Sequence, residues 1–214
     1  MRPPIEETPY NVAAPIVLAE VARLVAELSA DLKSGRGIAV AALLKDVHDA
    51  LRGLRTELDL SGDSPWGRQL AAIRADISKF LSSEINLMPG RVRRLMRPRP
   101  VKGITPGSTI DADEVAEAES LIGFVMACRN YASELAINEI TQRTFTELQQ
   151  CLDACTKTLL DAMRNCSENE RAFRQSQVDA AVRFCAKVFG QDYASLLTKA
   201  ADVASHGERK AAKA

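Results

Sequence analysis

The sequence has few residues of the kinds that most often carry out catalysis or bind metal ions. It contains two histidines and one tryptophan, and aromatic residues make up 5% of its 214 positions. It has no Gly-rich phosphate loop and no G-x-S-x-G, H-E-x-x-H or C-x-x-C motif. We therefore predict that the protein is not an enzyme and needs no cofactor, and we assign no catalytic residue.

Neither sign of charge is in excess, because 28 Lys and Arg residues balance 28 Asp and Glu residues. Domains whose surface is devoted to nucleic acid usually carry a clear basic excess, so this class is disfavoured. The longest stretch without a charged residue, Thr8 to Ala19, contains two prolines, and we predict no transmembrane helix and no membrane partner. The N-terminus lacks the apolar core of a signal peptide, which predicts a cytoplasmic location.

The cysteines and histidines show no metal-binding pattern. Cys151 and Cys155 are four residues apart and share a helix face, but a zinc site needs two further ligands. The histidines, His48 and His206, lie in distant segments. We therefore interpret all five cysteines as packing residues and predict no metal site. Adjacent helical positions point about 100° apart, so we do not expect Asp49 to orient the His48 ring.

Most of the chain has the apolar periodicity of helices, and no window shows the alternation of a half-buried strand. We predict an all-α bundle of six to seven helices. Pro, Gly and Ser residues mark the ends of three N-terminal helices. The first runs from near Ala14, with Pro15 in its first turn, to Gly35, and the second from about 38 to 58. The third begins at Pro65, after the N-cap Ser64, and ends at Pro89–Gly90.

The second half of the chain predicts one long helix, or a helix pair, between residues 113 and 165. Two apolar stripes in this range differ in phase by about 140–150°, and the change falls between Ala136 and Thr144. No strong helix breaker is present there, so both alternatives stay open. Ser167 and Glu170 then form a capping box at the start of the next helix, and a last helix ends near Gly207.

These elements predict a single helical domain over residues 1–214. Its alternative division has four parts: a three-helix unit over 12–88, a basic Pro-rich connector over 89–110, a C-terminal helical unit over 111–207 and a disordered tail over 208–214. The four-part division depends on the connector, because the proline and glycine at its start are expected to end the third helix.

The connector is strongly basic. Its candidate phosphate or nucleic-acid contacts are Arg91, Arg93, Arg94, Arg97, Arg99 and Lys102. Val92, Leu95 and Met96 have helical spacing, so we expect the first half of the connector to form a short turn docked on the bundle. In this structural interpretation, which we favour, the arginines pair with acidic residues such as Asp113, Glu114 and Glu117, or with the C-termini of helices.

We predict a helical scaffold or adaptor that acts through protein–protein contacts and forms a homo-oligomer. The candidate self-association face is the coiled-coil-like stripe of Leu148, Leu152, Cys155, Leu159 and Met163. A long helix whose two faces differ in phase cannot pack both of them on one neighbour, which motivates a partner. The alternative is a nucleic-acid-associated regulatory protein that binds phosphates through the Arg-rich connector.

Three segments carry a family resemblance: LSGDSPWGRQLAAIRADIS, PGRVRRLMRPRP and FRQSQVDAAVRFCAKVFGQDYASLL. They resemble a group of alphaproteobacterial helical proteins of unknown function, and the resemblance covers most of the chain. It implies a bacterial cytoplasmic setting. It supplies no activity, ligand or site residue.

Overall fold

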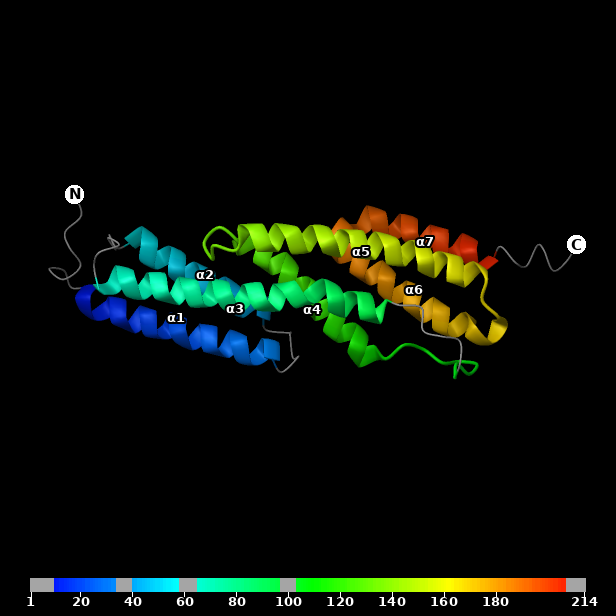
Figure 1. Ribbon diagram of the computed structural model, residues 1–214, viewed down its shortest axis with the longest axis horizontal. Helices are drawn as coiled ribbons and strands as arrows, with labels where there is room; N and C mark the ends of the chain where they lie inside the picture. The colour runs from blue at the N-terminus through cyan, green and yellow to red at the C-terminus, as the bar shows by residue number, and fades with distance from the viewer. Residues whose placement is uncertain (1–9, 34–39, 58–64, 97–102, 207–214) are drawn as a thin grey trace, which may run out of the picture. The chain divides into compact units, whose positions relative to one another are not determined.

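The structure is a computed structural model that describes residues 10–33, 40–57, 65–96 and 103–206. These residues form seven helices and no strand, which confirms the predicted all-α class (Figure 1). The helices are, in chain order, α1 (Tyr10–Lys33), α2 (Val40–Glu57), α3 (Pro65–Leu95), α4 (Ala112–Tyr131), α5 (Asn138–Arg164), α6 (Glu168–Phe189) and α7 (Gln191–His206). The predicted N-cap Ser64 and the predicted tail over 208–214 lie outside the described residues.

The chain forms two compact units whose boundaries lie inside helices. The first unit contains Met1–Asn86 and Ala127–Arg143, and the second contains Leu87–Met126 and Thr144–Ala214. As a result α3, α4 and α5 each contribute residues to both units. The predicted connector over 89–110 belongs wholly to the second unit.

In the first unit α1 and α2 pack against each other (Figure 1). Their buried residues repeat every three or four positions, as one face of a helix requires, and include Leu18, Val21, Leu28, Leu44, Val47 and Leu51. The first helix begins at Tyr10, before the predicted start near Ala14, and Pro15 lies inside it. A proline this close to the start of a helix removes one hydrogen bond of its first turns, and the helix continues through it.

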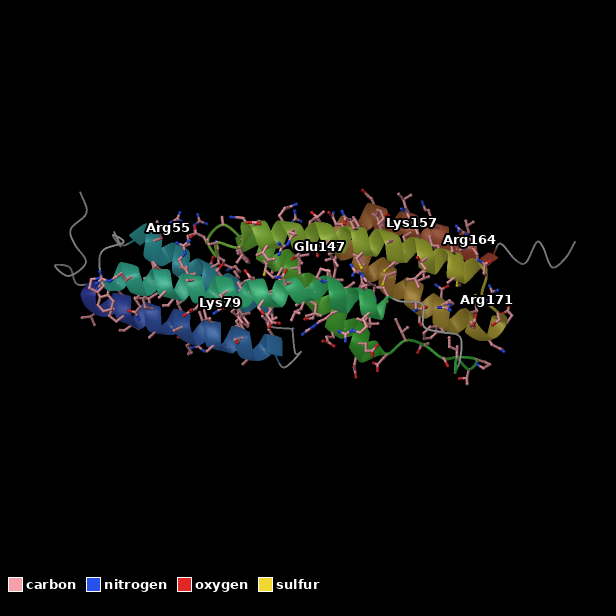
Figure 2. All side chains as sticks on the ribbon, viewed as in Figure 1. Arg55, Lys79, Glu147, Lys157, Arg164 and Arg171 are labelled. Atoms are coloured by element: carbon pink, nitrogen blue, oxygen red, sulfur yellow. The ribbon has the colours of Figure 1, made fainter. Side chains whose placement is uncertain are left out.

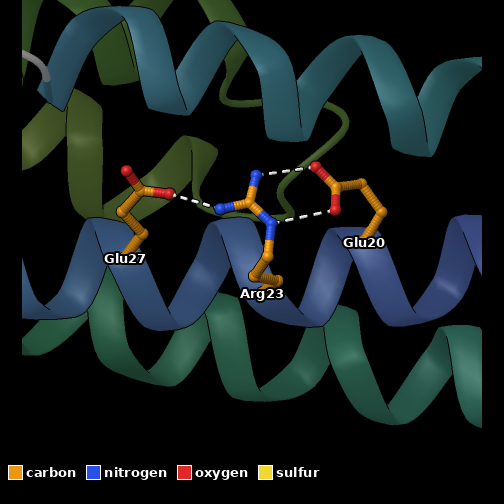
Figure 3. Close-up of polar contacts among 3 residues, drawn as sticks. All are labelled: Glu20, Arg23 and Glu27. Atoms are coloured by element: carbon orange, nitrogen blue, oxygen red, sulfur yellow. Dashed lines mark hydrogen bonds and ion pairs between the residues drawn. The ribbon is translucent and has the colours of Figure 1, made fainter.

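The exposed face of α1 carries charged side chains in its middle turns. Arg23 lies between two glutamates of its own helix, with Nη2 2.7 Å from Glu20 Oε1 and Nη1 2.7 Å from Glu27 Oε2 (Figure 3). The hydrogen bond from Arg23 lowers the pKa of Glu20. Because all three side chains are about half exposed, solvent screens these pairs. These two ion pairs therefore contribute little to the stability of the fold.

α3 continues through Pro89 and Gly90, where the sequence predicted its end, and reaches Leu95. A proline inside a helix removes a backbone hydrogen bond and disfavours the helix by about 3 kcal/mol. Met88 and Val92, on either side, are both fully buried, and burying a side chain of this size contributes roughly 1.5–3 kcal/mol. The buried face therefore outweighs the breakers, and the predicted docked turn is the last part of a long helix.

The alternatives for residues 113–165 resolve as a helix pair, α4 and α5, joined by a turn over 132–137. Ala136 has a φ of 55°, a left-handed conformation that disfavours a residue other than glycine by about 1–2 kcal/mol. Arg74 of α3 donates from Nη2 to the Glu134 carbonyl oxygen over 2.8 Å. This contact satisfies a carbonyl that the end of α4 leaves without a helical partner.

The core of the second unit contains residues from all of its helices. Its buried members include Val92 of α3 and Met96 just after it, Val115, Ala118 and Ile122 of α4, Phe145, Leu148, Leu152 and Leu159 of α5, Val178, Phe184 and Cys185 of α6, and Leu197 and Ala201 of α7. The predicted capping box is confirmed, with Ser167 N–H donating to Glu170 Oε2 over 3.3 Å. Gly190, at φ 95°, ends α6 and lets α7 pack back against it.

Charged side chains cover outward positions of the helices (Figure 2). On α5, Lys157 and Arg164 pair with Asp153 and Asp161 of the same helix. Across the described ranges, none of the helices combines the length and the apolar character that crossing a membrane requires.

Replacing Leu152 by alanine is expected to lower the free energy of unfolding by about 2–5 kcal/mol, because this side chain is fully buried in the core of the second unit. Denaturant unfolding at several protein concentrations measures the effect. The control is Leu87→Ala, because Leu87 is 50% exposed and its truncation should change stability by about 0.5 kcal/mol. An effect of Leu152→Ala that is no larger than the control, or that vanishes on dilution, would contradict a core role.

Candidate functional site

The stripe predicted for self-association lies inside the second unit. Four of its side chains are at most 2% exposed: Leu148, Leu152, Leu159 and Met163. The fifth, Cys155, is partly buried. Because these residues already contact helices of their own chain, they do not offer an exposed face to a second copy. A spacing of three and four residues results from packing within a chain as well as between chains.

α7 carries an apolar stripe that we call the α7 seam, formed by Tyr193, Leu196, Ala200 and Val203, and Tyr193 at its start also packs against the core. Leu196 and Val203 are 66% and 71% exposed, while Tyr193 and Ala200 are partly buried. The successive spacings are three, four and three residues, which is the pattern of coiled-coil contact positions. The other apolar face of α7 packs into the core. α7 is therefore apolar on two sides, and one of them faces solvent.

The described arginines of the predicted phosphate site lie on the last turns of α3, next to the acidic start of α4. Arg91 Nη1 is 3.8 Å from Glu117 Oε1, which agrees with the predicted pairing. Arg94 and Glu114 line the same cavity of about 460 Å³. A phosphate entering it would meet two carboxylates. The remaining predicted contacts lie outside the described residues: Arg97, Arg99 and Lys102.

Two cysteines and an arginine meet at another cavity of the second unit, and we call this group the thiol cluster. Cys151 and Cys155 lie one turn apart on α5 with their sulfurs 3.9 Å apart. Arg93 of α3 lines the same cavity, of about 410 Å³, and its positive charge lowers the pKa of Cys151. The other lining residues are Met96, Glu147, Gln150, Ala154 and Thr158. Cys151 is 6% exposed.

The surroundings of Cys151 favour its thiolate. The hydrogen bond from Cys155, assisted by Arg93, lowers the pKa of Cys151 to about 6, although burial acts in the opposite direction. The same contact raises the pKa of Cys155, because a thiol that donates to a thiolate retains its proton. The pair therefore releases one proton in the mildly acidic range and keeps the other.

The other three cysteines lack these surroundings. Burial raises the pKa of Cys185 to about 12 and raises that of Cys128 as well. Cys166 is buried, and its Sγ donates to the Met163 carbonyl over 3.1 Å. These three side chains are buried and act as packing residues, as the sequence predicted. In the described part of the chain, no group of three or more His, Cys, Asp and Glu residues is placed to hold a metal ion.

In the first unit His48 contacts a carboxylate and an aromatic ring. Its Nδ1 lies 3.0 Å from Asp49 Oδ1, and Lys45 Nζ lies 2.7 Å from the other oxygen of that carboxylate. The expectation that Asp49 would not reach the ring is wrong, because rotation of the two side chains closes the angle between adjacent positions. The ring centres of His48 and Tyr131 are 4.6 Å apart. We assign His48 a packing role between these neighbours.

The sequence did not reveal Arg93 as a neighbour of the cysteine pair, or the α7 seam as an exposed surface. The spacing of Cys151 and Cys155 was visible, but Arg93 comes from a distant helix that the prolines were expected to end. For α7, the apolar residues could not be divided between core and solvent without the fold. No signal in the local sequence makes either distinction.

Comparisons of the chain with family models, with curated proteins and with solved structures find no match. The resemblance to alphaproteobacterial helical proteins therefore stays a prediction.

The Cys151 thiol is expected to titrate with a midpoint near pH 6, measured by the ultraviolet absorbance of the thiolate. In Cys155→Ala the hydrogen bond is lost, so the midpoint should rise toward the ordinary thiol pKa of about 8.5. Because folding favours the thiolate, its stabilisation is present above the ordinary thiol pKa and is lost as the pH falls through about 6.

Cys166→Ala is the matched control for this titration, since Cys166 bonds to a backbone carbonyl and not to the pair. The acidic transition should be unchanged in this variant. An unchanged midpoint in Cys155→Ala would contradict the assignment.

Proposed function

We propose that the protein is a non-catalytic helical scaffold or adaptor that self-associates through the α7 seam. The observation that carries the proposal is the exposure of Leu196 and Val203, seven residues apart on one side of α7. Two exposed apolar residues at this spacing extend the pattern of coiled-coil contacts over two turns of the helix. Contact with a second helix would remove both from water.

A second copy of the chain is the partner that we favour. Lys199 and Asp202 are exposed beside the α7 seam, so the same surface presents both signs of charge and can complement itself. The chain has no net charge, so two copies do not repel each other at long range. A contact between identical surfaces would be two-fold symmetric and closed, giving a dimer.

The association is expected to be weak. Burying Leu196 and Val203 contributes roughly 1.5–3 kcal/mol each, and about 4 kcal/mol or more is lost in bringing two chains together. Each chain also contributes only one helix of 16 residues. A dissociation constant of micromolar order or weaker fits these magnitudes.

Phosphate binding by the basic segment has less support. Arg91 pairs with Glu117, and the cavity shared by Arg91 and Arg94 also contains Glu114. A phosphate would have to compete with these carboxylates for the same guanidinium groups. The scaffold proposal requires no such competition.

Replacing Leu196 by aspartate is expected to weaken dimerisation by at least about tenfold, because the contact would then have to bury an unpaired carboxylate. Light scattering over a wide concentration range measures the average mass, which for the wild type should rise from one chain toward two. Circular dichroism checks that the variant remains helical.

Val12→Asp is the matched control, since Val12 is an apolar residue of α1 that is 67% exposed. This variant should associate as the wild type does. A wild type that stays monomeric at all concentrations, or equal losses in the two variants, would contradict the proposal.

A further inference from the structure

The thiol cluster has a chemistry that a helical scaffold does not use. We propose that Cys151 is a reversible oxidation site, whose thiolate reduces small hydroperoxides and is converted to a sulfenic acid. The site consists of Cys151 as the nucleophile, Cys155 as its hydrogen-bond donor and Arg93 as the neighbouring cation. It is independent of the α7 seam.

The first requirement is a thiolate, because the thiolate and not the thiol is the nucleophile. The Cys151 sulfur is 3.9 Å from that of Cys155, a thiol of the same helix face. The guanidinium of Arg93, from a second helix, lines the same cavity as this sulfur. The two groups lower the pKa of Cys151, whereas burial raises the pKa of Cys128 and Cys185. Cys151 is thereby singled out among these cysteines.

The second requirement is access for the oxidant. Cys151 and Arg93 both line the cavity of about 410 Å³, which also presents the polar side chains of Gln150 and Thr158. A hydroperoxide is small and polar, so it fits such a cavity. With Cys151 only 6% exposed, a bulky thiol-reactive molecule has poor access to the sulfur. The cavity therefore favours small oxidants over large ones.

The charged and polar groups around Cys151 also favour its reaction as a thiolate. Arg93 is the cation that compensates the thiolate, and it can also donate to the oxygen that leaves the peroxide. Glu147 is the acidic residue among the side chains that line this cavity. Cys155 retains its proton and donates it to the neighbouring sulfur as a hydrogen bond.

The reaction is a two-electron transfer. The Cys151 sulfur attacks one peroxide oxygen, an S–O bond forms, and the O–O bond breaks. The second oxygen leaves with the electron pair of that bond and takes up from solvent the proton that the Cys151 thiol had released, giving water from hydrogen peroxide or an alcohol from an alkyl hydroperoxide. The sulfur is oxidised to Cys–SOH and the hydroperoxide is reduced.

The geometry disfavours a disulfide between the two cysteines. Residues four apart on a helix have Cβ atoms about 5–6 Å apart, whereas a disulfide brings them to about 3.8 Å. Closing that bond would require α5 to distort where Leu152 is fully buried in the core. The oxidised site should therefore stay a sulfenic acid. Two equivalents of a small thiol return it to the thiol, the first forming a mixed disulfide with loss of water and the second cleaving it.

The test treats the reduced full-length chain with hydrogen peroxide for a set time and then unfolds it in the presence of dimedone, which traps sulfenic acids, so that the trap reaches the buried sulfur. Peptide mass spectrometry follows. We expect an adduct on Cys151, with fragment ions distinguishing it from Cys155. Cys151→Ser should abolish the adduct, and Cys166→Ser should leave it unchanged, because Cys166 bonds to a backbone carbonyl away from the pair.

Arg93→Ala tests the mechanism without touching a cysteine. Without Arg93 the pKa of Cys151 should rise. Below that pKa, a rise of about one unit reduces the thiolate fraction about tenfold, so trapping at mildly acidic pH should slow by about tenfold. Circular dichroism confirms that the variants are helical. Failure of the wild type to form the adduct, an intrachain disulfide as the main product, or an unchanged rate in Arg93→Ala would overturn the proposal.

Discussion

The continuity of α3 through Pro89–Gly90 is the constraint on which the arrangement of the second unit depends. A helix that ended at these residues would leave the following side chains without a fixed direction. Because it continues, Val92 enters the core, and Arg93, about 100° further round the helix, lies beside Cys151. The buried apolar face thus holds the proline in the helix. The same face gives the arginines of the predicted connector fixed places against α4 and α5.

The sequence correctly predicted those features of the fold that depend on interactions between residues close together in the chain. The all-α class follows from periodicity, and the start of α6 follows from Ser167 and Glu170, whose capping contact involves only neighbouring residues. The turn over 132–137 could not be located in this way. It contains no strong breaker, and it is held in part by Arg74, a residue distant in sequence. The end of α3 was misplaced for the corresponding reason, since Val92 compensates for Pro89 through tertiary burial.

The same limit applies to the functional surfaces. The stripes of α5 and α7 have similar spacing, yet Leu152 is buried while Leu196 is exposed. Periodicity states which residues share a helix face and gives no information on whether a neighbour covers that face. The cysteine pair is comparable. Its spacing could be read from the sequence, but its chemistry depends on Arg93, whose proximity to Cys151 exists only in the folded unit.

The thiol cluster lies where a reactive sulfur is compatible with a packed core. A thiolate buried without a partner would carry a large desolvation penalty, as the raised pKa of Cys128 illustrates. At the rim of a cavity, a hydrogen bond from Cys155 and the charge of Arg93 offset that penalty while the sulfur stays accessible to a small molecule. Buried neighbours on α5 hold the helix in place, so a change in the oxidation state of Cys151 alters the charge and polarity of the cavity before it alters the fold. A cysteine at the next position of α5, where Leu152 is fully buried, would be held as firmly by its neighbours, but an oxidant would not reach its sulfur.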